Sequence, residues 1–400
     1  MKYVVVIADG MADYPISELD GKTPLEAFEK PIIDSLAKQA LCGIVKTVPE
    51  NMSPGSDVAN LSIFGYDPTR FFSGRAPLEA ASMGVDMGLG DVAFRCNLVT
   101  LRDNGGKTIM DDYSAGHITT DEAEPFIKLL NEKISKKEVS FHKGVSYRHL
   151  MLWKNGKYSM KLTPPHDIPD KEVSEFMPSG EGADFITELM LESQKVFKDC
   201  EINKNRKRLG KKEVSSIWLW GHGKKPSMPT FSEKFGLKGA VISAVDLIFG
   251  IGVLAGLKPI KVKGATGYID TNFEGKAVEA VEALQSNDIC FIHIEACDEA
   301  SHEGSLEKKK VGIQAIDSRF LKTLLNGLEQ FDDFRLLFCI DHPTPVKLKV
   351  HVADPVPFFV YDNKKQFRGV DSFSEKSCKN SNFFVEEGYK LINILLNGDI

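Results

Sequence analysis

Short apolar segments that lead into acidic residues recur along this chain and constrain its fold more than any other feature. Segment 3–8 is rich in β-branched residues and stops at Asp9, as expected of a buried parallel strand. Strand-like runs at 288–296 and 334–340 likewise lead into Asp298 and Asp341. Because helical patterns alternate with these strands, the sequence predicts an α/β fold with a parallel-rich sheet flanked by helices.

Further elements follow the same alternation. Thr23-Pro24-Leu25-Glu26 combines a capping box with a proline at the first helical position, which predicts a helix start. We also expect strands at 239–243 and 357–361 and helices at 246–257 and 306–330.

The middle of the chain has a different pattern. Segments 146–154 and 157–162 flank Asn155-Gly156, the strongest short hairpin signal, and 183–209 has the pattern of one helix. These features predict a smaller α+β domain that is inserted into the α/β domain. We place the insert at residues 91–235 and the core at residues 1–90 and 236–400.

Composition excludes several classes of partner. The 400 residues are 42% hydrophobic and 26% charged, so the chain can bury a sizeable core. A net charge of −6 argues against a nucleic-acid-binding surface, although local basic patches could still bind a small anion. The seven cysteines form no Cys-x-x-Cys pair, which favours a reducing compartment.

Membrane association is not expected either. The apolar run at the N-terminus is too short for a signal peptide. The longest apolar stretch, 240–257, contains Asp246 and three glycines and is therefore poor material for a membrane span. We expect a cytoplasmic protein.

Six acidic and imidazole side chains fall where strands end or helices begin. They are Asp9, Asp298, His302, Asp341, His342 and His351. Ligands in open α/β sheets collect at the carboxyl ends of strands, and Asp298 and His302 are spaced to share one helical face. Carboxylate and imidazole ligands suit Mn²⁺ or Zn²⁺ better than Ca²⁺. For any one residue alone a helix cap or an ordinary histidine is the simpler interpretation, but six together favour a metal site.

Ser56 adds a hydroxyl group to this set. It follows Gly55 in a small-residue turn and would open a helix whose free amides favour an anion. A serine becomes a strong nucleophile only when a base or a metal lowers its pKa. A simple N-cap role is an equally weighted alternative, and Ser53 is a rival for the nucleophile.

Sequence motifs across nearly the whole chain carry a family resemblance. They are Ala-Asp-Gly-Met-Ala-Asp at 8–13, Ser-Pro-Gly-Ser-Asp-Val-Ala-Asn at 53–60, Gly-Tyr-Asp-Pro at 65–68, Gly-Arg-Ala-Pro-Leu-Glu-Ala-Ala at 74–81, Pro-Pro-His-Asp-Ile at 164–168, Gly-Ala-Thr-Gly at 264–267, Asp-Glu-Ala-Ser-His-Glu-Gly at 298–304 and Asp-His-Pro-Thr-Pro at 341–345. In this order they resemble the cofactor-independent phosphoglycerate mutases of the archaeal-type branch, within the alkaline phosphatase superfamily.

The resemblance implies an alkaline-phosphatase-like fold and a site with two divalent metal ions. One ion would be held by Asp298, His302 and His351, and the other by Asp9, Ser56, Asp341 and His342. Ser56 would be phosphorylated transiently while 2-phosphoglycerate and 3-phosphoglycerate interconvert in glycolysis and gluconeogenesis. Mn²⁺ is the favoured ion, with Zn²⁺, Co²⁺ or Mg²⁺ as alternatives, and 2,3-bisphosphoglycerate is not required.

The insert would bind the substrate, a small phosphorylated hydroxy acid. By resemblance the binding candidates are His117, Arg148, His166, Arg206 and Arg208, with Asp167 as a general acid/base. The basic run 203–212 is alternatively a solvated charged face. His293 lies mid-strand, which predicts a structural role.

One departure from the family leaves the phosphate acceptor open. Phe249 stands where a substrate-binding lysine is expected, and phenylalanine donates no hydrogen bond. The branch also includes proposed homoserine kinases, so a homoserine kinase or another small-molecule phosphotransferase using the same site is the alternative. A degenerate relative that keeps metals only for stability is disfavoured by the complete ligand set. The oligomeric state is not determined by the sequence.

Overall fold

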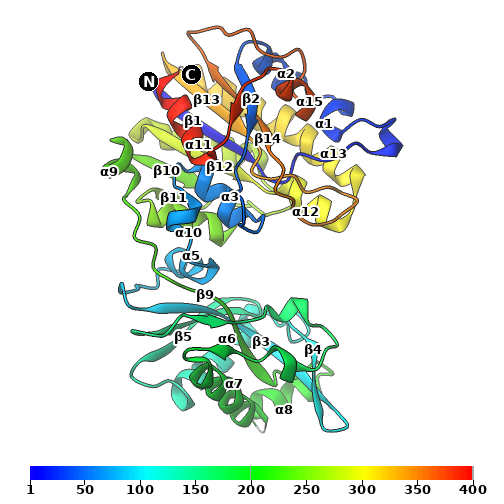
Figure 1. Ribbon diagram of the computed structural model, residues 1–400, viewed down its shortest axis with the longest axis vertical. Helices are drawn as coiled ribbons and strands as arrows, with labels where there is room; N and C mark the ends of the chain where they lie inside the picture. The colour runs from blue at the N-terminus through cyan, green and yellow to red at the C-terminus, as the bar shows by residue number, and fades with distance from the viewer. Residues whose placement is uncertain (199, 399–400) are drawn as a thin grey trace. The chain divides into compact units, whose positions relative to one another are not determined.

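The computed structural model describes residues 1–198 and 200–398, which divide into two compact units (Figure 1). The first unit consists of residues 1–72 together with the chain from Met228 onward, and the second is Ser73–Ser227. Both divisions lie before the boundaries expected from the sequence. At the first, helix α5 (Arg75–Ser82) packs on strands of the second unit.

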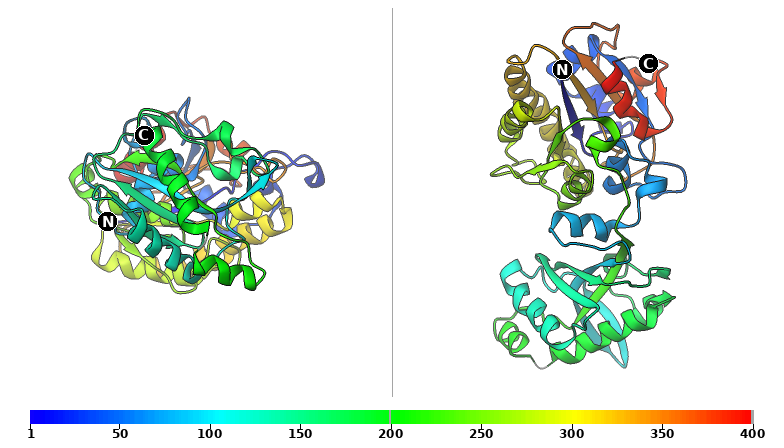
Figure 2. Two further views of the ribbon diagram at one scale, coloured as in Figure 1. Left: turned by 90° about the horizontal axis from the view of Figure 1, so that it is seen from below. Right: turned by 90° about the vertical axis from the view of Figure 1, so that its left-hand side faces the viewer.

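An eight-stranded sheet forms the centre of the first unit, in the order β11-β10-β12-β1-β13-β14-β2-β15. Strand β14 is antiparallel to both its neighbours, whereas the other neighbouring pairs in this sheet are parallel. The right-hand view of Figure 2 shows helices on both sides of this sheet, the α11–α14 group on one side and α16 on the other. The predicted parallel-rich α/β class is therefore confirmed.

The strands of this sheet match most of the predicted ranges. Their bounds are β1 Lys2–Ala8, β2 Leu41–Val45, β10 Gly239–Ile242, β11 Lys258–Ile260, β12 Ile289–Ile294, β13 Phe334–Cys339, β14 Val356–Asp362 and β15 Phe384–Val385. The residues of β12 are buried throughout, as are most of those of β1 and β13, because helices cover both faces.

Among the helices of the first unit, α1, α3, α10 and α13 begin at the positions that the sequence indicates. The helices of this unit include α1 Pro24–Ala27, α2 Pro31–Lys38, α3 Ser56–Ile63, α4 Pro68–Phe71, α9 Phe231–Phe235, α10 Asp246–Leu254, α11 Phe273–Ser286, α12 Ala296–Glu303, α13 Leu306–Ala315, α14 Lys322–Leu328, α15 Glu375–Lys379 and α16 Leu391–Asn397. The Thr23–Glu26 capping box is formed as predicted. The long helix expected at 306–330 is interrupted by a π-helical turn at Ile316–Leu321, where Asp317 accepts a hydrogen bond from the backbone of Ile33.

The second unit is built on an antiparallel sheet. Strand β3 (Val92–Asn104) pairs along its first part with both β6 (Arg148–Trp153) and β9 (Ser216–Lys224), and β4 (Lys107–Asp112) and β5 (Val139–Val145) extend the sheet. Strands β7 (Met160–Lys161) and β8 (Ser179–Gly180) form a separate short ribbon.

Two predictions for this unit are wrong in detail. The hairpin partner of β6 is β5, and the turn contains Ser146, whose φ is 58°. Asn155-Gly156 does form a turn, but the chain after it pairs with β8 rather than with β6. The helix expected at 183–209 is two helices, α7 (Ala183–Lys198) and α8 (Glu201–Arg208), with Cys200 as the N-cap of α8.

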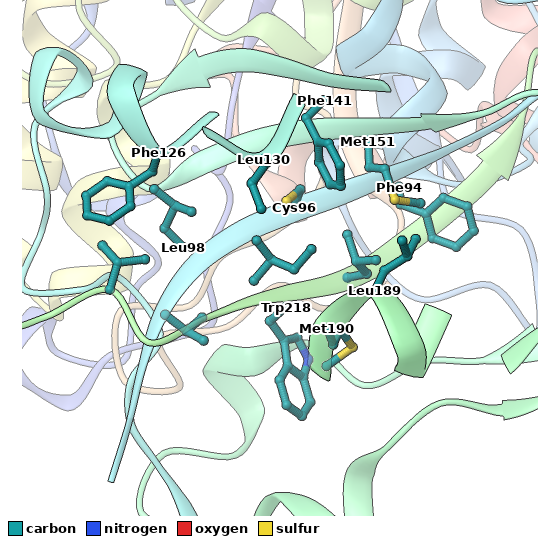
Figure 3. Close-up of a cluster of buried hydrophobic side chains, with 14 of the residues drawn as sticks. Phe94, Cys96, Leu98, Phe126, Leu130, Phe141, Met151, Leu189, Met190 and Trp218 are labelled. Carbon is teal, nitrogen blue, oxygen red and sulfur yellow. The ribbon is translucent and has the colours of Figure 1, made fainter. Parts of the chain in front are cut away.

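A separate hydrophobic core holds the second unit together. Figure 3 shows Phe94, Cys96 and Leu98 of β3 packed with side chains from neighbouring strands and helices. Helices α6 (Thr120–Lys133) and α7 cover the sheet and contribute Phe126, Leu130, Leu189 and Met190. Within the described parts of the chain, every helix is too short or too polar to cross a membrane.

Candidate metal centre and nucleophile

The carboxyl ends of three neighbouring strands bring distant acidic residues together. Strand β1 pairs with β12 through Ala8 and Ile294, and with β13 through Ile7 and Cys339. Continuing both registers places Asp9 beside Glu295 on one side and beside Asp341 on the other. The predicted grouping of polar side chains at this edge follows from strand register alone.

Ser56 is the first residue of α3 and points its hydroxyl into the same cluster. Its Oγ lies 3.2 Å from His342 Nε2. Four residues later on α3, the buried Asn60 Nδ2 donates to the Ser56 carbonyl at 2.8 Å and to Asp341 Oδ2 at 3.0 Å. Asn60 thus connects the start of the helix to the acidic edge of the sheet.

A second cluster surrounds Asp298 in the first turn of α12. His302 Nε2 lies 3.1 Å from Asp298 Oδ2, and His351 Nε2 lies 3.3 Å from Asp298 Oδ1. His302 Nδ1 is 2.9 Å from the Lys349 carbonyl and can only donate to it, so a neutral His302 ring carries its lone pair on Nε2. The two Nε2 atoms are 2.8 Å apart, so the ligand atoms converge as for a shared cation.

His342 lies between the two clusters. Its ring stacks on His351 with centroids 3.9 Å apart, and its Nε2 is 3.4 Å from Asp341 Oδ2. Two sets of three possible ligand atoms can be distinguished, and within each set all atoms lie within 4.8 Å of one another. They are Asp298, His342 and His351 in one set, and Asp9, His293 and Asp341 in the other. All seven residues expected to form the metal site lie in these clusters or directly beside them.

The electrostatics of this site favour bound cations. Burial, together with the neighbouring Asp341 and Asp298, raises the pKa of Asp9 well above its usual range. Asp9 Oδ1 is buried and has no hydrogen-bond partner. Burial acts in the same direction on Asp298, but hydrogen bonds with His302 and His351 hold its pKa well below the usual range. A divalent cation would allow these carboxylates to ionise together, so the donor set fits metal ions.

Sequence reasoning missed several residues that support the site. Asn60 and Thr344 belong to the quoted motifs, but nothing in their type predicts that they contact Asp341 and Asp298. Thr344 Oγ1 donates to Asp298 Oδ1 at 2.6 Å. Glu295, at the end of β12, could have been found by extending the strand register from Asp9.

Aromatic rings in the second unit connect several of the predicted substrate-binding residues. Arg148 lies over the Tyr147 ring, which also contacts His117 and Tyr113. His166 contacts Tyr113 and the ring of Trp220. His117, Arg148 and His166 are exposed, so their polar groups are accessible.

Two arginines that the sequence reasoning did not select join this group. Arg95 is buried with its guanidinium 4.2 Å from the Trp220 ring centroid and its Nε 3.0 Å from Glu79. Arg75 pairs with the same carboxylate at 3.2 Å, and both arginines, after burial, help to lower the pKa of His166. Arg75 lies in the Gly74–Ala81 motif that carries part of the family resemblance, whereas Arg95 lies on β3 outside the quoted motifs.

The remaining three candidates differ in exposure and in the contacts that they already make. Arg206 is buried, and its guanidinium donates to the Lys212 and Ala115 carbonyls and pairs with Glu122 at 3.0 Å. These contacts favour a structural role for Arg206. Arg208 is exposed on α8, and Asp167 is exposed 3.7 Å from His166.

Phe249 is buried in α10 among apolar neighbours of the sheet. The side chain is therefore a core residue and cannot supply the ammonium group expected at this position.

The chain is similar over its whole length to one group of enzymes. Residues 37–203 match the family described as 2,3-bisphosphoglycerate-independent phosphoglycerate mutase. A probable 2,3-bisphosphoglycerate-independent phosphoglycerate mutase of Geobacter sulfurreducens is 50% identical, with 99% of this chain and 100% of the relative covered. The 2,3-bisphosphoglycerate-independent phosphoglycerate mutase of Methanosarcina acetivorans is 49% identical, again over 99% of this chain and 100% of the relative.

Solved structures agree with this similarity. The cofactor-independent phosphoglycerate mutase of Thermoplasma acidophilum is 25% identical, with a TM-score of 0.69 and 99% of each chain covered. A protein from Pyrococcus horikoshii is 27% identical, with a TM-score of 0.83, covering 99% of this chain and 96% of that one.

Proposed function

The chain belongs to the family of 2,3-bisphosphoglycerate-independent phosphoglycerate mutases, and from this premise we propose that it interconverts 2-phosphoglycerate and 3-phosphoglycerate through a phosphoserine at Ser56. The observation that carries the proposal is the position of Ser56 Oγ, 3.2 Å from His342 Nε2 at the start of α3. The hydroxyl group is thus beside both clusters of metal-ligand types and at the positive end of a helix.

The proposed ligands divide between two divalent ions, with Mn²⁺ as the favoured ion. Asp298, His302 and His351 would hold one ion, and Asp9, Ser56, Asp341 and His342 would hold the other. When bound, such ions polarise phosphoryl oxygens and promote ionisation of a coordinated hydroxyl. The unpartnered Asp9 Oδ1 and the convergent Nε2 atoms of His302 and His351 support this assignment.

The proposed transfer conserves the phosphoryl group. Ser56 Oγ attacks the phosphorus of 3-phosphoglycerate, the bond from phosphorus to the substrate oxygen breaks, and the bond to Oγ forms. The proton lost by Ser56 is balanced by the proton that the leaving hydroxyl gains. In the second half, the 2-hydroxyl of the bound glycerate attacks the phosphoserine and releases Ser56.

The free amides at the start of α3 would stabilise the transferring phosphoryl group. Gly55 has an extended backbone and no side chain, and since the Val58 amide donates to Asp57 Oδ1 at 2.9 Å, the amides of Ser56 and Asp57 would be the donors to the phosphoryl group. Asn60 holds Asp341 at this position through its amide. Removing that hydrogen bond would allow the acidic edge and the serine to shift relative to each other.

The second unit is proposed to bind the substrate anion. Arg148, His166 and the exposed Arg208 are the candidate donors retained from the sequence, together with His117, and Asp167 is the candidate acid/base. Arg75 and Arg95 are added because both pair with Glu79 and both lower the pKa of the neighbouring His166. Arg206 is left out because its donors are already used.

The experiment that tests this function follows phosphorus NMR of Mn²⁺-loaded protein with 3-phosphoglycerate. We expect 2-phosphoglycerate to form without added 2,3-bisphosphoglycerate. A parallel sample with ATP and homoserine tests the alternative acceptor, which stays open because Phe249 stands where a substrate-binding lysine is expected. Phosphohomoserine in that sample, with no 2-phosphoglycerate in the first, would overturn the proposal. Ser53→Ala is the matched control for Ser56→Ala, since Ser53 is exposed three residues earlier and should keep full turnover.

A further inference from the structure

His293 is a buried histidine at the metal centre that the proposed ligand set does not use. It is 1% exposed, and its Nε2 lies 3.1 Å from Asp9 Oδ2. Its Nε2 is also one of the three atoms that, with Asp9 and Asp341, lie within 4.8 Å of one another. The side chain extends from β12 into the acidic edge of the sheet.

The other ring nitrogen of His293, Nδ1, contacts Glu295, which forms an ion pair with Lys276. His293 Nδ1 is 2.8 Å from Glu295 Oε1, and Lys276 Nζ is 3.1 Å from Glu295 Oε2. Lys276 is fully buried and also donates to the His293 carbonyl at 2.8 Å. Ser243 Oγ and the Ala244 amide donate to Glu295 Oε1 at 2.9 and 3.2 Å.

These contacts determine which ring nitrogen carries the proton. Glu295 accepts hydrogen bonds from Lys276, Ser243 and the Ala244 amide, so it acts as an acceptor toward His293 as well. His293 Nδ1 must therefore donate, and in a neutral ring Nε2 carries a lone pair. A histidine that donates through one nitrogen to a carboxylate presents the other to a metal, in the arrangement common among metal-binding histidines.

The Nε2 atom of His293 is buried and has no hydrogen-bond partner. Although Asp9 Oδ2 is near, Nε2 makes no hydrogen bond, and Asp9 Oδ1 is also without a partner. An ionised Asp9 oxygen would be repelled by this lone pair at 3.1 Å, and a cation beside both atoms would remove the repulsion.

We propose that His293 Nε2 is an additional ligand of the cation held by Asp9 and Asp341, oriented by Glu295 and Lys276. The inference rests on the proposed metal site. It changes the predicted ligand set of that ion from one histidine, His342, to two.

The test measures metal binding directly. Titration calorimetry and metal analysis of wild-type protein with Mn²⁺ should give two ions per chain. His293→Ala should weaken one of the two sites by more than about 10-fold, since even removal of a residue that only orients a ligand costs about 10- to 100-fold in affinity. Glu295→Gln should weaken the same site, by about 10-fold. His142→Ala is the control, because His142 lies in the second unit and contacts Ser140.

A crystal structure of the Zn²⁺-loaded protein then separates direct ligation from orientation of Asp9. We expect His293 Nε2 within about 2.0–2.1 Å of one ion. The inference would be overturned if two ions bind and His293 Nε2 is not a ligand of either. It would also be overturned if His293→Ala leaves the affinities of both sites unchanged. Either result would leave the proposed function intact. If the wild-type protein binds no Mn²⁺ or Zn²⁺, the proposed function fails as well. Should His293→Ala not fold, His293→Gln gives the same readout with the volume retained.

Discussion

Ser56 Oγ and His342 Nε2 lie 3.2 Å apart although 286 positions separate the two residues in the sequence. This contact joins the start of α3 to the end of β13, where Asp341 meets Asp9 across the sheet. The proposed phosphoryl transfer depends on that junction, because it places the nucleophile beside the ligands of both ions.

Replacing Asn60 with Ala should loosen the junction without removing a metal ligand. The change deletes the donor to Asp341 Oδ2 and to the Ser56 carbonyl. We expect Mn²⁺ affinity to fall by about 10- to 100-fold, as for other residues that orient ligands. Calorimetry provides the measurement, and Asn131→Ala, which removes a comparable amide in the second unit, should leave the affinity unchanged. Unaltered binding in Asn60→Ala would show that the amide does not orient Asp341.

Replacing Lys309 with Met should destabilise the first unit. Lys309 is fully buried, pairs with Asp13 at 2.8 Å and donates to the carbonyls of Ala12 and Thr344. Its loss leaves Asp13 buried without a counterion, which typically costs about 3–5 kcal/mol. Urea denaturation followed by circular dichroism measures the change. Lys322→Met, at an exposed position on the same helical stretch, should be neutral, and equal stabilities of the two variants would contradict the assignment.

Replacing Arg206 with Met should affect stability, in contrast to Arg208. The Arg206 guanidinium holds the Ala115 and Lys212 carbonyls and Glu122, so we expect a loss of about 1.5–3 kcal/mol. All three tryptophans, Trp153, Trp218 and Trp220, lie in the second unit, so tryptophan fluorescence reports on its unfolding. Arg208→Met should unfold like the wild-type protein. A stability loss for Arg208→Met and none for Arg206→Met would reverse the roles of the two arginines.

His149 should make the second unit sensitive to acid. Burial lowers the pKa of His149 to about 3, and the neutral ring accepts a hydrogen bond from the Gly144 amide. Between an unfolded pKa of about 6.5 and this folded value the unfolded chain binds more protons, so stability is complete above the unfolded pKa and falls as the pH drops. At pH 5 the expected loss is about 2 kcal/mol.

The variant His149→Asn removes the titratable imidazole but keeps a side-chain acceptor for the Gly144 amide. Tryptophan fluorescence during urea denaturation at pH 7.5 and pH 5 should show a smaller difference for the variant than for the wild-type protein. An identical pH dependence in both proteins would rule out His149 as the source.

The sequence predicts much of this structure because residue types mark locally where a buried strand ends. Asp9, Asp298 and Asp341 follow buried strands, so their meeting at one edge required only a parallel sheet. The positions of Lys276 and Glu295 could not be predicted in the same way. A buried lysine is rare, and its partner depends on how α11 packs on β12.

The same distinction explains the incorrect hairpin prediction and the unexpected contacts of Arg206. Asn155-Gly156 forms a turn, as its residue types require, but tertiary pairing decides that β5 is the partner of β6. Arg206 has the residue type of an anion binder, and only the fold reveals that carbonyl groups and Glu122 already occupy it.

The central claim is that the phosphoryl group passes through Ser56. Its most direct test is rapid acid quenching of Mn²⁺-loaded protein during turnover of 3-phosphoglycerate, followed by mass spectrometry of the peptides. We predict phosphate on Ser56 within the first turnover, and its absence from the Ser56→Ala variant, which should also lose turnover. Turnover at a normal rate in Ser56→Ala, or phosphate on Ser53 or another residue instead, would contradict this claim.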